Sequence, residues 1–125
     1  MSLSVDVFVI GEDGGRHVLD TPEGANDLAG FESWRTRVWG SDAVRALGAW
    51  FFPVLADSDL WIAPGQVPDF RRECALLRAN LERIASQPYP QKTYEWYLDT
   101  LSVRLGFIED AAERAAEVGG GVVIW

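Results

Sequence analysis

Residues 93–125 have the sequence TYEWYLDTLSVRLGFIEDAAERAAEVGGGVVIW, and this stretch decides the fold. Its apolar residues recur every three or four positions, which places them on one face of a helix. That face consists of Tyr94, Leu98, Leu101, Leu105, Ile108, Ala112 and Ala115. Thr93 is a good N-cap, and the glycines at 119–121 end the helix. We therefore expect a long helix over 93–118, followed by a strand over 121–125 whose burial requires pairing in a sheet.

The N-terminus supplies partners for that strand. Residues 3–10 alternate between apolar and polar at first and then become continuously apolar, which is typical of a strand that enters the interior of a sheet. Residues 12–15 tolerate a tight turn, so residues 16–20 are expected to return as the second strand of a hairpin. The following stretch, 21–30, is rich in Pro, Gly, Asn and Asp and predicts a loop.

Two more helices are expected between the hairpin and the long helix. Ser41 is a good N-cap for a short one. The second covers residues 68–85, because Phe70, Cys74, Leu77, Leu81 and Ile84 share one helical face. We predict a single α+β domain over residues 1–125. Its small antiparallel or mixed sheet consists of the N-terminal hairpin and the C-terminal strand, with three helices packed on one face.

The composition is that of a packed, acidic protein. The 125 residues are 48% hydrophobic, and their net charge of −8 argues against nucleic acid and anionic membranes as partners. Residues 1–10 lack the basic start and apolar length of a signal peptide or membrane anchor. One cysteine allows no internal disulfide, which suits a reducing compartment. We predict a cytoplasmic protein.

No catalytic motif stands out. His17 is the only histidine and has no partner nearby in sequence, while Cys74 falls on an apolar helix face, where a cysteine is usually a small buried hydrophobe. Asp57, Asp59 and the acids near residue 110 could offer oxygen ligands, but their spacing matches no calcium loop. We predict no catalytic residue, no metal site and no cofactor.

The six tryptophans are the most unusual feature of the sequence. Trp50 and Trp125 lie in strongly apolar runs and are expected in the core. Trp34 and Trp39 alternate with arginines in a segment of weak periodicity, which leaves two alternatives: they cap the open end of the core, or they are partly exposed and anchor a partner. We assign them to the partner surface.

Acidic residues crowd the second half of the long helix, at Glu109, Asp110, Glu113 and Glu117. Like charges four residues apart destabilise an isolated helix, and a cationic partner would relieve that repulsion. These four acids are the predicted contacts for such a partner.

The middle and end of the chain resemble small immunity proteins of bacterial polymorphic toxin systems. The resemblance rests on the segment 51–55, on Leu60 and Val67, on a helix with Glu73, Leu76, Leu77 and Ile84, and on an Ala-rich helix followed by the Val122–Ile124 strand. It implies a protein that is not an enzyme and that neutralises a cognate toxin by binding it.

We therefore predict a non-catalytic protein-binding module whose partner is a protein with a basic surface, contacted by the two tryptophans and four acids named above. One alternative is a small-ligand-binding domain or an enzyme of unfamiliar type, with a pocket lined by Trp and Tyr. Another is a homo-oligomeric structural protein, such as a homodimer whose C-terminal strands pair across a two-fold axis.

Overall fold

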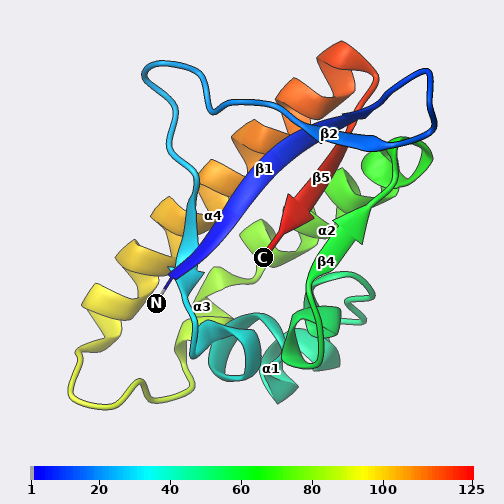
Figure 1. The fold of residues 1–125 in the computed structure, drawn as a ribbon. Coiled ribbons are helices and arrows are strands. Elements are labelled where there is room, and N and C mark those ends of the chain that lie inside the picture. The colour runs from blue at the N-terminus through cyan, green and yellow to red at the C-terminus, as the bar shows by residue number, and fades with distance from the viewer. Residues whose placement is uncertain (1) are drawn as a thin grey trace.

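An antiparallel sheet forms around the N-terminal strand β1 (Ser2–Ile10) in the computed structural model, which describes residues 2–125. One edge of β1 pairs with β5 (Gly121–Ile124), which in turn pairs with β4 (Leu60–Ile62). The other edge pairs with β2 (Arg16–Val18) and, near its start, with β3 (Leu28–Phe31). The termini lie side by side in the sheet, because Trp125 and Ser4 exchange backbone hydrogen bonds (Figure 1).

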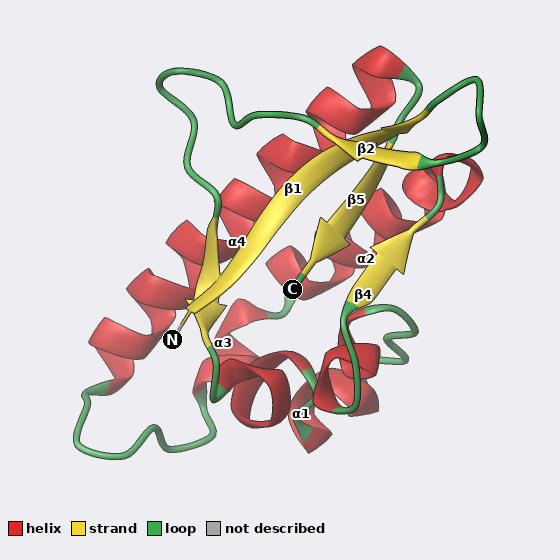
Figure 2. Cartoon of the chain, viewed as in Figure 1, coloured by secondary structure: helices red, strands yellow, loops and turns green. Residues whose placement is uncertain are grey.

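Four α-helices are present in the described part of the chain, and the two longest lie behind the sheet in Figure 2. They are α1 (Asp42–Ala46), α2 (Val67–Ala79), α3 (Leu81–Ala85) and α4 (Tyr94–Val118). Three other helical turns complete the helical part: η1 (Arg35–Trp39), η2 (Phe52–Ala56) and η3 (Pro64–Gln66). The predicted caps are confirmed at Ser41 and at Thr93. None of the helices within residues 2–125 is long and apolar enough to cross a membrane.

The core lies between the sheet and the helices, so the α+β prediction is confirmed. The predicted helix faces are buried at Leu101, Leu105, Ile108, Ala112 and Ala115, and also at Phe70, Cys74, Leu77 and Ile84. Leu81 and Leu98 are half-buried against this core. The prediction was wrong for Tyr94, which is 44% exposed at the first turn of α4.

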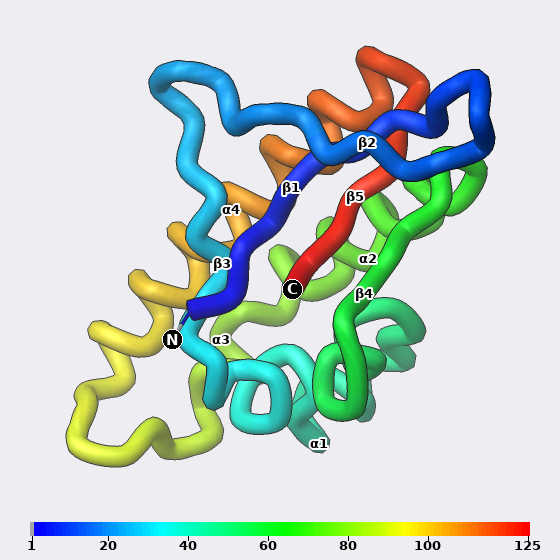
Figure 3. Tube along the Cα trace, viewed as in Figure 1, coloured from blue at the N-terminus to red at the C-terminus, as the bar shows by residue number. Residues whose placement is uncertain are grey.

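Two other expectations were wrong in detail. The helix predicted over 68–85 breaks at Asn80, whose backbone leaves the helical region at φ −125° and whose side chain donates to the Leu76 carbonyl at 2.8 Å. The loop predicted over 21–30 ends in β3, because the chain turns back alongside β1 and pairs Gly30 with Leu3 (Figure 3). Tertiary pairing, which local composition does not reveal, creates that strand.

The expectation that Trp34 and Trp39 are partly exposed was wrong, because both are completely buried. The segment forms a π-helical turn in which Gly40 donates to the carbonyl of Arg35, five residues earlier. This wider turn places the two indoles on the same side, with ring centroids 5.6 Å apart. Neither tryptophan is available to a partner.

The opposite error concerns Trp50 and Trp125, which were expected in the core. Trp50 is 84% exposed and Trp125 is 39% exposed. Trp50 precedes a turn that buries Phe52 and Pro53, and Trp125 lies at the sheet face opposite the main core. An apolar run in the sequence does not show which of its members face outward.

Candidate functional site

All six acids of α4 lie along one stripe of that helix. At about 100° per residue they fall within an arc of about 100° around the helix axis. They are Glu95, Asp99, Glu109, Asp110, Glu113 and Glu117. The two arginines of α4, Arg104 and Arg114, fall outside this arc, and Arg104 lies over the Phe31 ring beside β3 instead. We call these six residues the α4 acid stripe.

Repulsion between the carboxylates of the α4 acid stripe lowers the stability of α4. Carboxylates stand four residues apart at 95 and 99, at 109 and 113, and at 113 and 117, and each such pair costs about 0.2–0.5 kcal/mol. The last turn of α4 contains no basic residue. Glu117 therefore faces the negative end of the helix dipole without compensation from its own turn.

Arg78 of α2 neutralises one member of the stripe. Its guanidinium pairs with the Glu109 carboxylate and also donates to the Ser102 hydroxyl at 2.7 Å and to the Ser102 carbonyl at 3.2 Å. Arg78 crosses α4 beside Gly106, where an added Cβ would lie at an ordinary contact distance of 3.6 Å from Arg78 Nη2. Glu109 thus holds α2 to α4 and is not free for a partner, contrary to its predicted role.

The other three predicted acids remain exposed. Asp110 and Glu113 line a hollow between α2 and α4 together with Arg71. Glu117 lines a separate hollow beside Arg114, on the side of the loop that follows β2. The structure therefore brings Asp110 and Glu113 together and places Glu117 at the end of the stripe.

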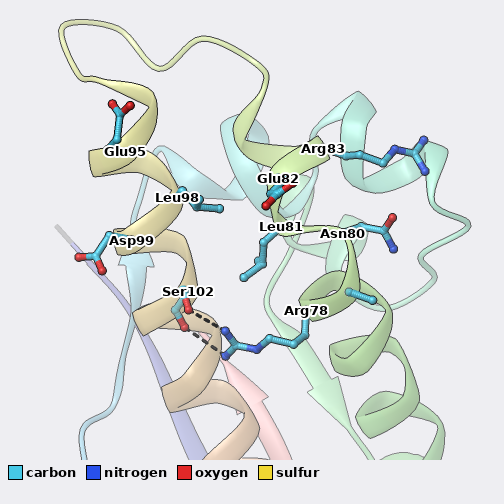
Figure 4. Close-up of a pocket in the computed structure, with 10 residues that line it drawn as sticks. Arg78, Asn80, Leu81, Glu82, Arg83, Glu95, Leu98, Asp99 and Ser102 are labelled. Atoms are coloured by element: carbon cyan, nitrogen blue, oxygen red, sulfur yellow. Dashed lines mark hydrogen bonds between the residues drawn. The ribbon is translucent and has the colours of Figure 1, made fainter.

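A groove of about 710 Å³ lies between α3 and the first half of α4. It opens where the chain breaks at Asn80, and Leu81 and Leu98 point toward each other between the two helices (Figure 4). Glu82, Glu95 and Asp99 add carboxylates to its lining.

The sequence analysis missed the acids at 95 and 99, although it contained a signal for them. Both fall on the same arc of the predicted helix as Asp110 and Glu113. Continuing the helical pattern toward residue 93 would have shown that acids lie on this face near both ends of α4, at 95 and 99 and again from 109 to 117.

The groups capable of nucleophilic or acid–base chemistry lie in separate parts of the fold. Cys74 is buried on α2, where burial above all, and then the charges of Glu109 and Glu73, raise the pKa of its thiol. His17 is exposed in the hairpin, 3.3 Å from Asp13. Within residues 2–125, no three His, Cys, Asp or Glu side chains come together in a way that could hold a metal ion.

The sheet face opposite the helices carries a small aromatic cluster. Trp61 packs edge-on against Phe8 at 5.2 Å and against Trp125 at 5.3 Å between ring centroids. The Arg16 guanidinium lies 4.3 Å above the Trp61 ring, and the Trp125 indole donates to Asp6 at 2.9 Å. These contacts partly cover the open sheet face, on which Trp125 remains 39% exposed.

The C-terminal strand has no free edge. β5 lies between β1 and β4 and pairs with both. A homodimer in which two β5 strands pair across a two-fold axis is therefore incompatible with this fold.

No protein-family model, no curated protein and no solved structure matches this chain. The resemblance to immunity proteins thus stays a prediction, and function is inferred from the surfaces described above.

Proposed function

We propose that this protein is a non-catalytic binding module whose partner is a protein with a basic surface that docks over the α4 acid stripe. The observation that carries the proposal is the stripe itself. Of its six carboxylates, Glu109 is paired with Arg78, and the other five lie on one side of the helix with no arginine or lysine of α4 among them. Charges that weaken their own helix are expected where function requires them.

The length of the stripe favours a macromolecular partner over a small ligand. From Glu95 to Glu117 the helix advances about 33 Å, at about 1.5 Å per residue. This span suits a standard protein–protein interface, which covers about 800 Å² on each partner. The adjoining groove with Leu81 and Leu98 adds apolar surface at one end of the stripe.

An immunity protein is the kind of binder that we propose. Neutralising a toxin requires a tight, fast complex and no catalytic group, and opposite charge speeds the encounter of two proteins. The resemblance in the segment 51–55, in α2 and in the C-terminal strand supports this narrower proposal.

Growth assays with the flanking reading frames test the proposal. We expect one flanking gene product to arrest growth when expressed alone and to be harmless when this chain is expressed with it. The purified pair should form a complex that weakens as the salt concentration rises.

A pair of matched variants makes the assay specific. Asp99→Lys with Glu113→Lys reverses two exposed charges of the stripe, and Glu12→Lys with Glu23→Lys makes the same change of net charge in the N-terminal loops. The first variant should lose protection and the second should keep it. Equal protection by both variants, or flanking products that neither arrest growth nor bind, would show that the proposal is wrong.

A further inference from the structure

Trp50 is the most exposed large apolar side chain of residues 2–125, at 84%. Exposed single apolar residues are common, but an almost fully exposed tryptophan presents a large amphipathic surface to solvent. Tryptophan is also among the residue types most enriched at the energetic centres of protein interfaces.

A buried carboxylate fixes the backbone at this tryptophan. Glu73 of α2 is buried and accepts hydrogen bonds from the backbone N–H groups of Trp50, Phe51 and Phe52. The bonds from Phe51 and Phe52 to Oε2 measure 2.9 and 2.8 Å. Burying a carboxylate is costly unless it is fully hydrogen-bonded, and here three consecutive donors satisfy it.

The side chains that follow hold the same turn from the other side. The rings of Phe51 and Phe52 pack on Phe70 of α2, at 5.7 and 5.3 Å between centroids. The backbone of Trp50 is therefore held in place, so binding through this residue costs little backbone conformational entropy.

The surface around Trp50 combines an apolar projection with a free negative charge. A shallow hollow of about 320 Å³ beside it is lined by Arg45, Val54 and Asp57, and Val54 is 40% exposed. The Arg45 guanidinium keeps its positive charge and donates to the carbonyls of Gly40 and Pro53, at 3.0 and 3.5 Å. Asp57 is exposed and its carboxylate makes no hydrogen bond or ion pair with any described residue.

We propose that Trp50 inserts into an apolar pocket of the basic protein partner, with an arginine or lysine at the rim of that pocket meeting Asp57. The charge of the partner rests on the proposed function, whereas the role of Trp50 as an anchor rests on its exposure and its fixed backbone. A protein fits better than a lipid surface, because the chain carries a net charge of −8 and has a carboxylate beside the tryptophan.

A displayed library of random peptides provides a probe that does not require the native partner. The library is selected on the intact chain in the presence of excess Trp50→Ala protein, so that clones independent of Trp50 are removed. Selected peptides are then synthesised, and their affinity is measured for the wild type, Trp50→Ala, Trp50→Phe, Asp57→Asn and Val118→Ala, the last being a control at an exposed apolar residue of α4.

We expect selected peptides that carry arginine or lysine next to apolar residues. Trp50→Ala should weaken their binding at least about tenfold, Trp50→Phe should weaken it less, and Val118→Ala should leave it unchanged. Asp57→Asn should reduce the salt dependence of binding. Peptides that bind all variants equally, or no enrichment at all, would overturn the inference.

Three further outcomes separate this inference from its competitors. In the first outcome, peptide binding requires Trp50, but the variant Asp99→Lys with Glu113→Lys still protects cells in the growth assay. The role of Trp50 as an anchor is then supported, and the proposed function is wrong. If the wild type, but not Trp50→Ala, sediments with vesicles of phosphatidylcholine and phosphatidylglycerol, Trp50 is a membrane contact and the inference is overturned. A dimer in sedimentation velocity that Trp50→Ala dissociates would assign Trp50 to a second copy and also overturn it.

Discussion

The indole of Trp39 lies at the centre of the aromatic part of the core. Its ring centroid is 4.9 Å from that of Phe52 and 5.6 Å from that of Trp34, and its N–H donates to the Ala29 carbonyl at 2.9 Å. A large side chain held in this way contributes both buried apolar area and a satisfied polar group. The aromatic residues exposed at the surface are therefore different from those that the sequence indicated.

Trp39→Ala should lower the free energy of unfolding by about 3–5 kcal/mol, as expected for removal of a fully buried indole. Trp50→Ala, at an exposed position, should change it by no more than about 0.5 kcal/mol. Urea unfolding followed by circular dichroism measures both. A mild effect of Trp39→Ala would mean that the packing around η1 is not as tight as the structure indicates.

Ionisation of Tyr97 in α4 should make the fold less stable at alkaline pH. Burial, and then the neighbouring Tyr89, raise the pKa of its hydroxyl to about 12. In the unfolded chain a tyrosine ionises near pH 10. The native state therefore resists ionisation, and the contribution of Tyr97 to stability is complete below about pH 10 and is lost as the pH rises toward 12.

Tyr97→Phe should remove this part of the pH dependence. The difference in unfolding free energy between wild type and variant should be constant up to about pH 10 and should then shift against the wild type. Urea unfolding at a series of alkaline pH values measures it, with the exposed Tyr94→Phe as the control. Parallel curves for wild type and Tyr97→Phe would contradict the assignment.

The elements that the sequence predicted well are those in which local pattern and tertiary packing agree. The helix expected over 93–118 is observed over 94–118, because its apolar face, its Thr93 cap and the glycines after it all indicate the same boundaries. The C-terminal strand is observed over 121–124 for the same reason.

The elements that were missed depend on partners distant in the sequence. β3 exists because β1 offers it an edge, and the π-helical turn of η1 because two indoles must both reach the core. The break at Asn80 is stabilised by a side-chain bond to Leu76, which a helical pattern does not reveal. The same limit applies to the site, since the acids of α4 follow from periodicity whereas the exposure of Trp50 depends on Glu73 from another element.

Gly106 lies in the middle of α4, at the point where the Arg78 side chain crosses the helix. Replacing it tests whether that crossing needs a glycine. Glycine within a helix costs about 1 kcal/mol relative to alanine. The nearest atom to a new Cβ would be Arg78 Nη2 at 3.6 Å, an ordinary contact distance. Gly106→Ala should therefore raise the free energy of unfolding by about 0.5–1 kcal/mol in urea titrations.

Gly121→Ala is the matched contrast in β5. A Cβ at this position would overlap both the Ile62 carbonyl oxygen and the Phe8 ring, so the variant should be strongly destabilised. If Gly106→Ala instead lowered the free energy of unfolding, the Arg78 side chain could not move aside for the new methyl group. Its ion pair with Glu109 would then require a glycine at position 106.

Charge is distributed unevenly over the molecule as a whole. The outer sheet cluster includes one acid and one base, Asp6 and Arg16, which are both held by tryptophans. The acid stripe of α4 lies on the helical side and contains six of the 19 Asp and Glu residues. The helical side that carries the stripe is therefore the surface from which we expect long-range attraction of a basic partner.

The two contact features should act on different steps of binding to such a partner. Long-range attraction by the stripe speeds the encounter and is screened by salt beyond about 10 Å at 0.1 M ionic strength. A desolvated aromatic anchor acts only after contact and mainly slows dissociation. Asp99→Lys with Glu113→Lys should therefore lower the association rate constant about tenfold or more at low salt, with little change in the dissociation rate constant. Trp50→Ala should do the reverse. Surface-immobilised kinetics at several salt concentrations separate the two rate constants, and association that is insensitive both to salt and to the double reversal would exclude electrostatic steering by α4.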